Sequence, residues 1–504
     1  MSLGTILIRA DASVGIGTGH VMRCLSLAQA WQDTGGTAMF VMAESVSSID
    51  ERLHLEKVDF VRLEVRAGSA DDAQETAEIA RAREAKWVVL DGYQFDAEYQ
   101  RRIKNTGVKL LVVDDLGQCS HYFGDLVLNQ NVHGNQAMYE NRESHARLLL
   151  GARFALLRRE FASLRKRKRE IAQIGRKVLI TMGGSDPDNV TAKVVEALSL
   201  VDVEGLQAVV LVGGGNPHTA FLKELAERSC SKIRTVTNPS SVAELMLWAD
   251  VAISGAGFTC WEMCFLGLPT LLVAVAENQM PGARELARRE IALHLGSTND
   301  ITPERIAAEL RSLLLSKQRR DCMSQRGQEL VDGCGSERVL TAMQSADLTV
   351  RRACKNDCRL LWEWANDPGV RAASFHTSKI PWEEHAAWFA QKLDSADALI
   401  YIAEDQHGKP VGQFRLEWLR DGNAQVDVSV APEKRGAGIA ASLILKAAQA
   451  AFRETELLRL HAYVKPENRA SLRAFEKAGF TNFETVGNAV HCSSERNRPY
   501  CGQV

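Results

Sequence analysis

The chain has 504 residues, of which 45% are hydrophobic and 25% are charged, and its formal net charge is −2 at pH 7. This length favours two or three domains, and the composition is that of an ordinary globular protein. A net charge near zero excludes a general electrostatic attraction to nucleic acid or to an acidic membrane surface. We therefore expect no nucleic-acid partner.

The chain contains 11 cysteines, but their spacing includes no pair of CxxC motifs and indicates neither a disulfide framework nor a zinc site. The C-terminal region contains His491, Cys492 and Cys501. Residues at this spacing are more often incidental than metal ligands, so we expect no metal. No stretch approaches the roughly 18 apolar residues of a membrane span, and the N-terminus has no secretory leader pattern. The expected location is the cytoplasm, with reduced thiols.

Residues 1–168 alternate short apolar runs with helix-like stretches. The apolar runs cover residues 6–10, 37–42, 87–92 and 109–117. This alternation predicts parallel β-strands with helices on both faces of the sheet. We expect a Rossmann-like domain over this range.

A dense basic segment, "FASLRKRKREIAQIGR", follows at 161–176 and looks helix-like; a solvated linker or a surface helix explains its charge. The alternation then restarts, and a second Rossmann-like domain is predicted over 169–345. Its apolar runs cover residues 177–186, 206–215, 232–238, 249–257 and 269–278, and a helical run closes it at 301–327. Two such domains in tandem imply a cleft, where ligands bind at the carboxyl ends of the strands.

The pattern changes after "TAMQSAD" at 341–347, which is the expected junction to a third domain over 348–504. This domain begins with a strand that turns helical, and further strand-like runs cover residues 398–405, 408–419, 423–432 and 458–464. The overall expectation is an α/β chain with two Rossmann-like domains flanking a cleft and a C-terminal α+β domain.

Glycine-rich turns follow four of the predicted strands: "VGIGTGH", "MGGSDPDN", "VGGGNP" and "SGAGFTCWE". A glycine after a strand allows close backbone approach to a ligand, and the helix that follows points free N–H groups at it. Such turns suit an anion, above all a diphosphate. A single turn of this kind is weak support, but four of them around a predicted cleft favour a phosphate ligand.

The fourth turn carries the most specific pattern. It places Ser254, Gly255 and Gly257 in the turn, and then Thr259 and Glu262 at the start of a helix. The Glu262 carboxylate can accept hydrogen bonds from both hydroxyls of a ribose, or it can simply favour the helix dipole. After the next strand, Asn278 and Gln279 offer amide contacts.

These residues resemble the UDP-sugar site of two-domain glycosyltransferases of the GT-B type. The opening "RADASVGIGTGHVMRCLSLA", with "VVDDLG" and "DLVLNQN", resembles the pseudaminic acid pathway hydrolases that cleave UDP-2,4-diacetamido-2,4,6-trideoxy-β-L-altropyranose to UDP and the free sugar. The resemblance covers roughly residues 5 to 340. It implies that Gly17, Gly19, Gly183, Gly184 and Ser185 contact the UDP-sugar.

The resemblance implies that His20 is the base that activates water. The helix dipole near His20 disfavours the imidazolium, so a neutral base is available near neutral pH. Asp11 could orient His20, bind the sugar or cap the turn. Tyr93 and Asn131 are expected sugar contacts. Asp114 and Asp115 either shape the cleft floor or end a strand.

The third domain contains "VDVSVAPEKRGAGIAASLILKAA" and then "VKPENRASLRAFEKAGF", which together resemble the GCN5-related N-acetyltransferases over about residues 348 to 490. The arginine, the small residues and the helix start suit a pyrophosphate. The resemblance implies acetyl-CoA as the cofactor. Its expected contacts are Val428, Val430, Arg435, Gly436, Gly438, Ala440, Asn468 and Ser471.

One position departs from that family. Many members have a tyrosine where this chain has Phe475, and its hydroxyl can protonate the leaving thiolate. His461 and Tyr463, on the neighbouring predicted strand, are substitutes that the sequence does not rank, and a buried core role fits either.

The combined expectation is a bifunctional enzyme of pseudaminic acid biosynthesis that acetylates a UDP-4-amino sugar and hydrolyses the product. Two alternatives stay open. The first two domains could form a glycosyltransferase with an acceptor other than water, and the third could sense acetyl-CoA without transferring its acetyl group.

Overall fold

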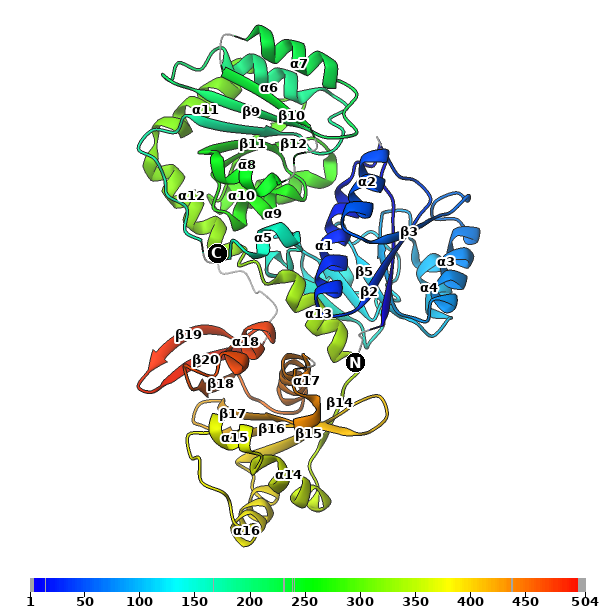
Figure 1. The fold of residues 1–504 in the computed structure, drawn as a ribbon, viewed down its shortest axis with the longest axis vertical. Helices are drawn as coiled ribbons and strands as arrows, with labels where there is room; N and C mark the ends of the chain where they lie inside the picture. Colours follow the sequence, from blue (N-terminus) through cyan, green and yellow to red (C-terminus); the bar gives the residue numbers. More distant parts are fainter. Residues whose placement is uncertain are drawn as a thin grey trace. The chain divides into compact units, whose positions relative to one another are not determined.

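The computed structural model of the protein describes residues 4–13, 15–165, 167–229, 232–237, 239, 241–436 and 438–496. The chain forms two compact units that divide between Ser336 and Glu337, drawn from blue to green and from green to red in Figure 1. We call them the N-terminal unit and the C-terminal unit.

The N-terminal unit begins with a seven-stranded parallel sheet in the order β3-β2-β1-β4-β5-β6-β7. Helices α3 and α4 pack with Leu7, Met39 and Val41 on one face of this sheet, and α1 lies on the other face (Figure 1). The elements are β1 Thr5–Ala10, α1 Gly19–Asp33, β2 Thr37–Met42, α2 Ser47–Leu55, β3 Asp59–Arg62, α3 Ala70–Ala82, β4 Ala85–Asp91, α4 Ala97–Lys104, β5 Lys109–Val113, β6 Leu126–Asn129 and β7 Arg147–Leu150.

A six-stranded parallel sheet follows in the order β10-β9-β8-β11-β12-β13. Alternate residues of its strands, such as Val178 and Ile180, are fully buried under α6 and α11. The elements are β8 Lys177–Thr181, α6 Val190–Leu198, β9 Gln207–Val212, α7 Thr219–Arg228, β10 Lys232–Thr237, α8 Val242–Trp248, β11 Val251–Gly255, α9 Thr259–Phe265, β12 Thr270–Ala274, α10 Met280–Arg288, β13 Leu293–Ser297, α11 Pro303–Leu315 and α12 Lys317–Leu330.

Strand order reverses at one place in each of these sheets, between β1 and β4 and between β8 and β11. In open parallel sheets the crevice outside the strand ends at such a reversal is the usual ligand site. The first glycine turn leads from β1 into α1, and the turns at 182–189 and 254–262 follow β8 and β11. Three of the four turns therefore stand at the two reversals.

Of the two readings of the basic segment at 161–176, a linker or a surface helix, the surface helix is wrong. Helix α5 is short, Arg159–Ala162, and the described residues from 163 to 176 contain no helix. Arg169 donates to the carbonyl oxygens of Met246, Ala249 and Leu266 at 2.6, 2.6 and 2.9 Å. These carbonyls end α8 and α9 and have no helical partner, so the arginine satisfies them. Burial lowers the pKa of Arg169 to about 10.

The C-terminal unit contains a seven-stranded sheet in the order β14-β15-β16-β17-β18-β20-β19, in which β17 and β18 are parallel and the other pairs antiparallel. Helix α13, Gly335–Ser345, spans the division between the units, so the expected junction "TAMQSAD" is largely helical. The other elements are β14 Thr349–Arg352, α14 Cys358–Ala365, α15 Pro368–Ala373, α16 Trp382–Leu393, β15 Ala398–Glu404, β16 Pro410–Trp418, β17 Asn423–Val430, α17 Ile439–Glu454, β18 Arg459–Val464, α18 Arg469–Lys477, β19 Thr481–Val486 and β20 Ala489–Glu495.

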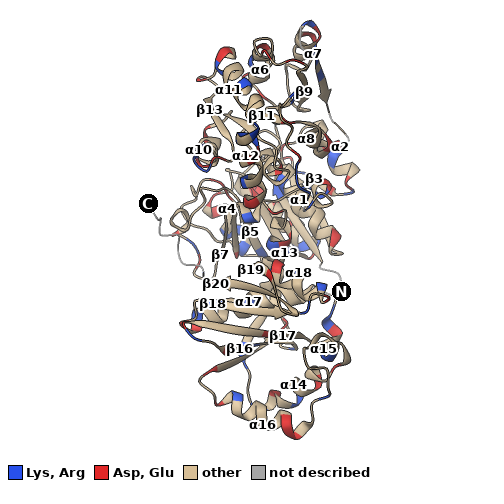
Figure 2. Cartoon of the chain, turned by 90° about the vertical axis from the view of Figure 1, so that its left-hand side faces the viewer, with Lys and Arg blue, Asp and Glu red and all other residues tan. Residues whose placement is uncertain are grey.

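Basic and acidic residues are interspersed over the chain in the view of Figure 2, which shows no face of one sign. This agrees with the near-zero net charge. Among the described residues, no helix is both long enough and apolar enough to cross a membrane.

Candidate functional site

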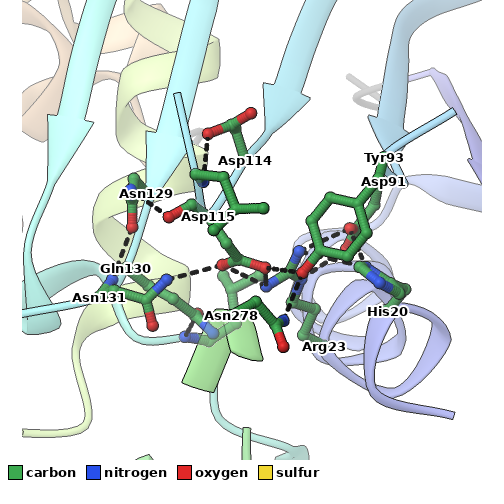
Figure 3. A network of polar contacts seen from close by, with 12 residues as sticks. His20, Arg23, Asp91, Tyr93, Asp114, Asp115, Asn129, Gln130, Asn131 and Asn278 are labelled. Atoms are coloured by element: carbon green, nitrogen blue, oxygen red, sulfur yellow. Dashed lines mark hydrogen bonds and ion pairs between the residues drawn. The ribbon is translucent and has the colours of Figure 1, made fainter. Parts of the chain in front are cut away.

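His20 lies at the reversal point of the first sheet, where the second position of α1 directs its side chain toward the end of β4. Its Nδ1 is 2.6 Å from Oδ1 of Asp91, the last residue of β4, and both side chains are buried. Their ring and carboxylate are drawn together in Figure 3. His20 therefore lies in the first turn of a helix and is also part of a buried polar pair.

The Asp91 carboxylate determines the tautomer of His20. Burial disfavours the ionised Asp91, but the charge of Arg23 and the hydrogen bonds that Arg23 and His20 donate outweigh burial and hold the pKa of Asp91 below its usual range. An ionised carboxylate accepts hydrogen bonds only, so Nδ1 of His20 must carry the proton it donates. The lone pair of the neutral imidazole is then on Nε2. His20 lines a cleft, and no described residue hydrogen-bonds its Nε2, so this atom is available as a base.

Arg23 connects this pair to a second carboxylate. It donates two hydrogen bonds to Asp91, at 2.6 and 2.7 Å, and its Nη1 lies 2.8 and 2.9 Å from the two oxygens of Asp115. Burial again opposes ionisation, and the charge of Arg23 again prevails and lowers the pKa of Asp115. Two carboxylates and one guanidinium are thus held charged at the base of the cleft.

Asp115 is also the centre of the contacts made by the predicted sugar-binding residues. It accepts from the Tyr93 hydroxyl at 3.1 Å and from the Asn131 amide at 2.7 Å. The Tyr93 hydroxyl in turn accepts from Asn278 at 2.6 Å, so a residue after β12 reaches the first sheet's site (Figure 3). Burial and the charge of Asp115 raise the pKa of Tyr93, which keeps the phenol protonated as the donor.

Asp11 was expected as a possible partner of His20, but its contacts are with other residues. It pairs with Arg9 at 2.6 Å and accepts from the backbone N–H of Ala43 and Glu44 and from Gln94. Asp91 takes the position beside His20 because β4, and not β2, borders β1 on the side of that ring. Asp11 is not among the residues that line the cleft to which His20 belongs.

Asp114 directly follows β5 and holds the turn at the strand's end, which is one of the two roles that the sequence left open. It accepts from the backbone N–H of Leu116 and Gly117 and from the hydroxyls of Tyr122 and Tyr139. Of the neighbouring pair, Asp115 alone belongs to the network around His20.

A cleft of about 480 Å³ lies between the carboxyl ends of the two parallel sheets. With the exception of Asp11, every residue predicted to contact the UDP-sugar or catalyse its cleavage lines it. These residues are Gly17, Gly19, His20, Tyr93, Asn131, Gly183, Gly184, Ser185, Ser254, Gly255, Gly257, Thr259, Glu262, Asn278 and Gln279.

Two glycines in the turns of the second sheet, Gly184 and Gly213, have no room for a side chain. A Cβ at Gly213 would lie 2.4 Å from the carbonyl oxygens of Gly183 and Gly184, and a Cβ at Gly184 would lie 2.5 Å from the Thr18 hydroxyl. Bare backbone therefore faces this part of the cleft, as binding of an anion by N–H groups requires. Ser254 donates its hydroxyl to the Gly255 carbonyl at 2.9 Å.

Glu262, the expected ribose ligand, is buried and already paired. Arg158 donates to its two oxygens at 2.6 and 2.8 Å. Burial raises the pKa of Glu262, and the charge of Arg158 offsets only part of that rise. Each carboxylate oxygen has a second lone pair, so Glu262 can accept from Arg158 and from a hydroxyl at the same time.

Several residues of this site were missed in the sequence: Asp91, Arg23, the central role of Asp115, and Arg158. A usable signal existed for Asp91. It ends the fourth strand of a domain whose rhythm is typical of a doubly wound sheet, and in such sheets strand 4 borders strand 1.

In the C-terminal unit, the predicted coenzyme loop is an open turn before α17. Gly436 and Gly438 both have φ of +76°, and Arg435 pairs with Asp367 at 2.6 Å. Ala440 is the second residue of α17, and Val428 and Val430 end β17. Asn468 caps α18 by accepting from the backbone N–H of Ser471 at 3.1 Å, which gives these two residues a local structural contact.

Phe475 is buried and packs edge-on against Phe480, so no hydroxyl stands at that position. His461 and Tyr463 are not core residues. Tyr463 is 39% exposed, and His461 is half-buried beside His491, with Nδ1 2.9 Å from His491 Nε2. No metal-ligating cluster of His, Cys, Asp or Glu occurs among the described residues, and Cys501 lies outside them.

Two ranges of the chain are similar to known protein families. Residues 178–333 match the glycosyltransferase family 28 C-terminal domain, and residues 347–481 match the acetyltransferase (GNAT) domain. An uncharacterised protein of Methanocaldococcus jannaschii is 24% identical over 487 residues, which cover 94% of this chain and 96% of that protein.

The UDP-2,4-diacetamido-2,4,6-trideoxy-β-L-altropyranose hydrolase of Campylobacter jejuni is 25% identical over 286 residues, 56% of this chain and 96% of that enzyme. The crystal structure of MurG from Acinetobacter baumannii is 15% identical and spans 68% of this chain and 99% of its own, with a TM-score of 0.48.

The family matches and the three sheets confirm the expected fold class, with two parallel α/β sheets before a mixed C-terminal sheet. The chain therefore combines a unit of two parallel α/β sheets, in which residues 178–333 are similar to the glycosyltransferase family 28 C-terminal domain, with a mixed-sheet unit in which residues 347–481 are similar to the acetyltransferase (GNAT) domain.

Proposed function

We propose that the N-terminal unit hydrolyses a UDP-linked sugar, UDP-2,4-diacetamido-2,4,6-trideoxy-β-L-altropyranose, to UDP and the free sugar. The observation that carries the proposal is the buried His20–Asp91 pair, which leaves Nε2 of His20 as a free base lining the cleft. The substrate rests on the likeness to the Campylobacter hydrolase and on the diacetamido sugar that its name gives.

In this reaction His20 takes a proton from water at Nε2 as the water oxygen attacks the anomeric carbon. The bond between that carbon and the UDP oxygen breaks, and UDP leaves with the electron pair. Asp91 stabilises the imidazolium because its carboxylate accepts the Nδ1–H. Backbone N–H groups of the turns at 182–189 and 254–262 would hold the diphosphate, and Glu262 would accept from the ribose.

For the C-terminal unit we propose acetyl-CoA as the cofactor and the amino group of the preceding UDP-4-amino sugar as the acceptor. The Arg435 loop and the start of α17 would receive the pyrophosphate of the coenzyme. The acetylated product would then be the substrate of the hydrolase, so that one chain carries two consecutive steps.

The test of the hydrolase is UDP release from the diacetamido substrate by the full chain with no acceptor added. Substituting His20→Ala should lower kcat by roughly 10²–10⁴-fold, the usual contribution of a positioned base, and leave UDP-sugar affinity nearly unchanged. The matched control is His145→Ala, an exposed histidine of the same unit whose ring is 3.5 Å from Asp125.

Two results would contradict the proposal. Release of UDP that requires a sugar or lipid acceptor would favour a glycosyltransferase, and full turnover by the His20→Ala variant would remove His20 as the base.

A further inference from the structure

The two parallel strands at the centre of the C-terminal sheet separate along their length. β17 pairs with β18 only at Asn423, Ala424 and Gln425, opposite Arg459, Leu460 and His461. Beyond that point β17 stays paired with β16, and β18 stays paired with β20. The sheet therefore forks between its two central strands, and His461 stands at the last paired position.

His461 and Tyr463 project from one face of this fork. The alternating residues Leu460, Ala462 and Val464 are buried in the core with α17 and α18. Successive side chains of a strand point to opposite faces, so His461 and Tyr463 lie on the face away from these helices. His491 of β20 lies opposite Tyr463 in the strand register, with the ring centroids 5.0 Å apart.

Hydrogen bonds determine which nitrogen of His461 carries a proton. The Asn423 amide nitrogen donates to the carbonyls of Arg420 and Asp421, at 2.9 and 3.1 Å, which turns its oxygen toward His461. That oxygen is 2.9 Å from His461 Nε2, so Nε2 must be the protonated nitrogen. In the neutral ring, Nδ1 is then an acceptor.

The same reasoning extends to His491. Because Nδ1 of His461 accepts, Nε2 of His491 donates across their 2.9 Å contact. Burial lowers the pKa of His461, which favours this neutral state. The lone pair of neutral His491 is therefore on Nδ1. No described residue hydrogen-bonds that atom.

We propose that His491 Nδ1 is the base that takes the proton from the acceptor amine, with His461 and Asn423 as positioning residues that fix its tautomer. The inference rests on the acetyl transfer proposed above, and adds the group that performs it. When Nδ1 of His491 is protonated, its Nε2–H still donates to His461, so the imidazolium keeps its partner.

The step balances as follows. The acceptor ammonium loses one proton to His491 Nδ1, and the neutral nitrogen attacks the thioester carbonyl of acetyl-CoA. The C–S bond of the tetrahedral adduct breaks, and the second nitrogen-bound proton goes to the thiolate sulfur. The products are the acetamide and free coenzyme A, and His491 later releases its proton to solvent. No hydroxyl at the position of Phe475 is needed.

The experiment measures coenzyme A thiol release by the full chain, with acetyl-CoA and the UDP-4-amino sugar. The His491→Ala variant should lose roughly 100-fold in kcat while KM for acetyl-CoA stays unchanged, and added imidazole should restore part of the rate. His407→Ala, an exposed histidine in the turn between β15 and β16, is the matched control and should keep the wild-type rate.

A positioning role for His461 has its own readout. With ¹⁵N-labelled histidine, His491 should give the Nε2–H tautomer in the wild type and a mixture of tautomers in His461→Ala, whose kcat should fall about 10-fold. Full activity of His491→Ala beside an active wild type would overturn the inference alone. A wild type that binds acetyl-CoA but releases no thiol would overturn the proposed acetyl transfer, and the inference with it.

Discussion

At the scale of single residues, the chemistry of the cleft depends on which carboxylate faces His20. Four aspartates, at positions 11, 91, 114 and 115, stand at the ends of neighbouring strands of one sheet. Only Asp91 contacts the ring, because α1 begins above the border between β1 and β4. The local sequence does not show which of these four aspartates contacts His20, whereas the order of the strands in the sheet does.

Substituting Asp91→Asn should disable the base without removing it. An amide group facing Nδ1 can donate as well as accept, so it no longer enforces the tautomer with a lone pair on Nε2, and it no longer stabilises the imidazolium. We expect kcat for UDP release to fall about 100-fold or more with UDP affinity retained. Asp11→Asn is the control, and an equal loss in that variant would contradict the assignment of Asp91.

The buried carboxylates also predict how stability depends on pH. Folding lowers the pKa of Asp91 and Asp115, so their stabilising contribution is complete above the ordinary aspartate pKa of about 3.9. It is lost as the pH falls below that value through their folded pKa values. The melting temperature of the N-terminal unit should therefore decrease when the pH is lowered below about 4.

Calorimetric scans between pH 6 and pH 2.5 would check this dependence, with the two units followed as separate transitions. The slope below about pH 4 should be shallower in Asp91→Asn than in the wild type, and unchanged in Asp188→Asn, an exposed residue of the same unit. An Asp91→Asn variant as acid-sensitive as the wild type would contradict the charged cluster.

At the scale of elements, the sequence predicts most of the strands and the glycine turns after them, because buried parallel strands are continuous apolar runs and tight strand–helix turns need small residues. The sequence predicts the structure of highly charged segments less well. The basic segment at 161–176 looks like a surface helix, yet Arg169 uses its guanidinium to satisfy the carbonyl ends of α8 and α9. Such long-range roles leave no local pattern.

The cleft shows the same division. The glycine turns line the cleft, and the turn itself is a local signal in the sequence. Arg23 and Arg158 were not predicted, since each acts through a partner 68 to 104 residues away. The order of the strands in the sheet brings residues that are far apart in the sequence into contact. The alternation of apolar runs does not by itself specify that order.

Substituting Gly213→Ala should disturb the turn after β8, which we propose holds the diphosphate. The added methyl group would meet the carbonyl oxygens of Gly183 and Gly184 at 2.4 Å, and backbone atoms move less readily than a side-chain end. We expect UDP binding, measured by titration calorimetry, to weaken about 10-fold, which corresponds to about 1.4 kcal/mol.

Gly15→Ala is the matched control for that variant. A Cβ at Gly15 has nothing within 4 Å, so its UDP affinity should equal that of the wild type. Equal affinities in all three proteins would show that the turn at 182–189 does not hold the nucleotide.

At the scale of the whole molecule, the two proposed reactions use separate sets of residues. The hydrolase groups all lie before Ser336, and the acetyl-transfer groups all lie after Glu337. The reactions are nevertheless chemically ordered, because acetylation of the amino group produces the diacetamido sugar that hydrolysis consumes.

This separation predicts complementation between two defective chains. His20→Ala should still acetylate the UDP-4-amino sugar. Arg435→Glu, which places a like charge against the coenzyme phosphates, should still hydrolyse the diacetamido substrate. Each variant alone should fail to convert the UDP-4-amino sugar and acetyl-CoA into free diacetamido sugar, and an equimolar mixture should succeed, as followed by chromatography of the sugar products.

The time course of the mixture shows whether the acetylated intermediate is released to solvent. If the intermediate is released to solvent, the mixture should reach the wild-type rate once the acetylated UDP-sugar accumulates to its KM, after a lag that shortens as total enzyme rises. A wild type with no lag beside a mixture with a long one would mean that the intermediate passes within one chain. A mixture that never forms free sugar, although each variant keeps its own half-reaction, would contradict the assignment of the two steps to a common intermediate.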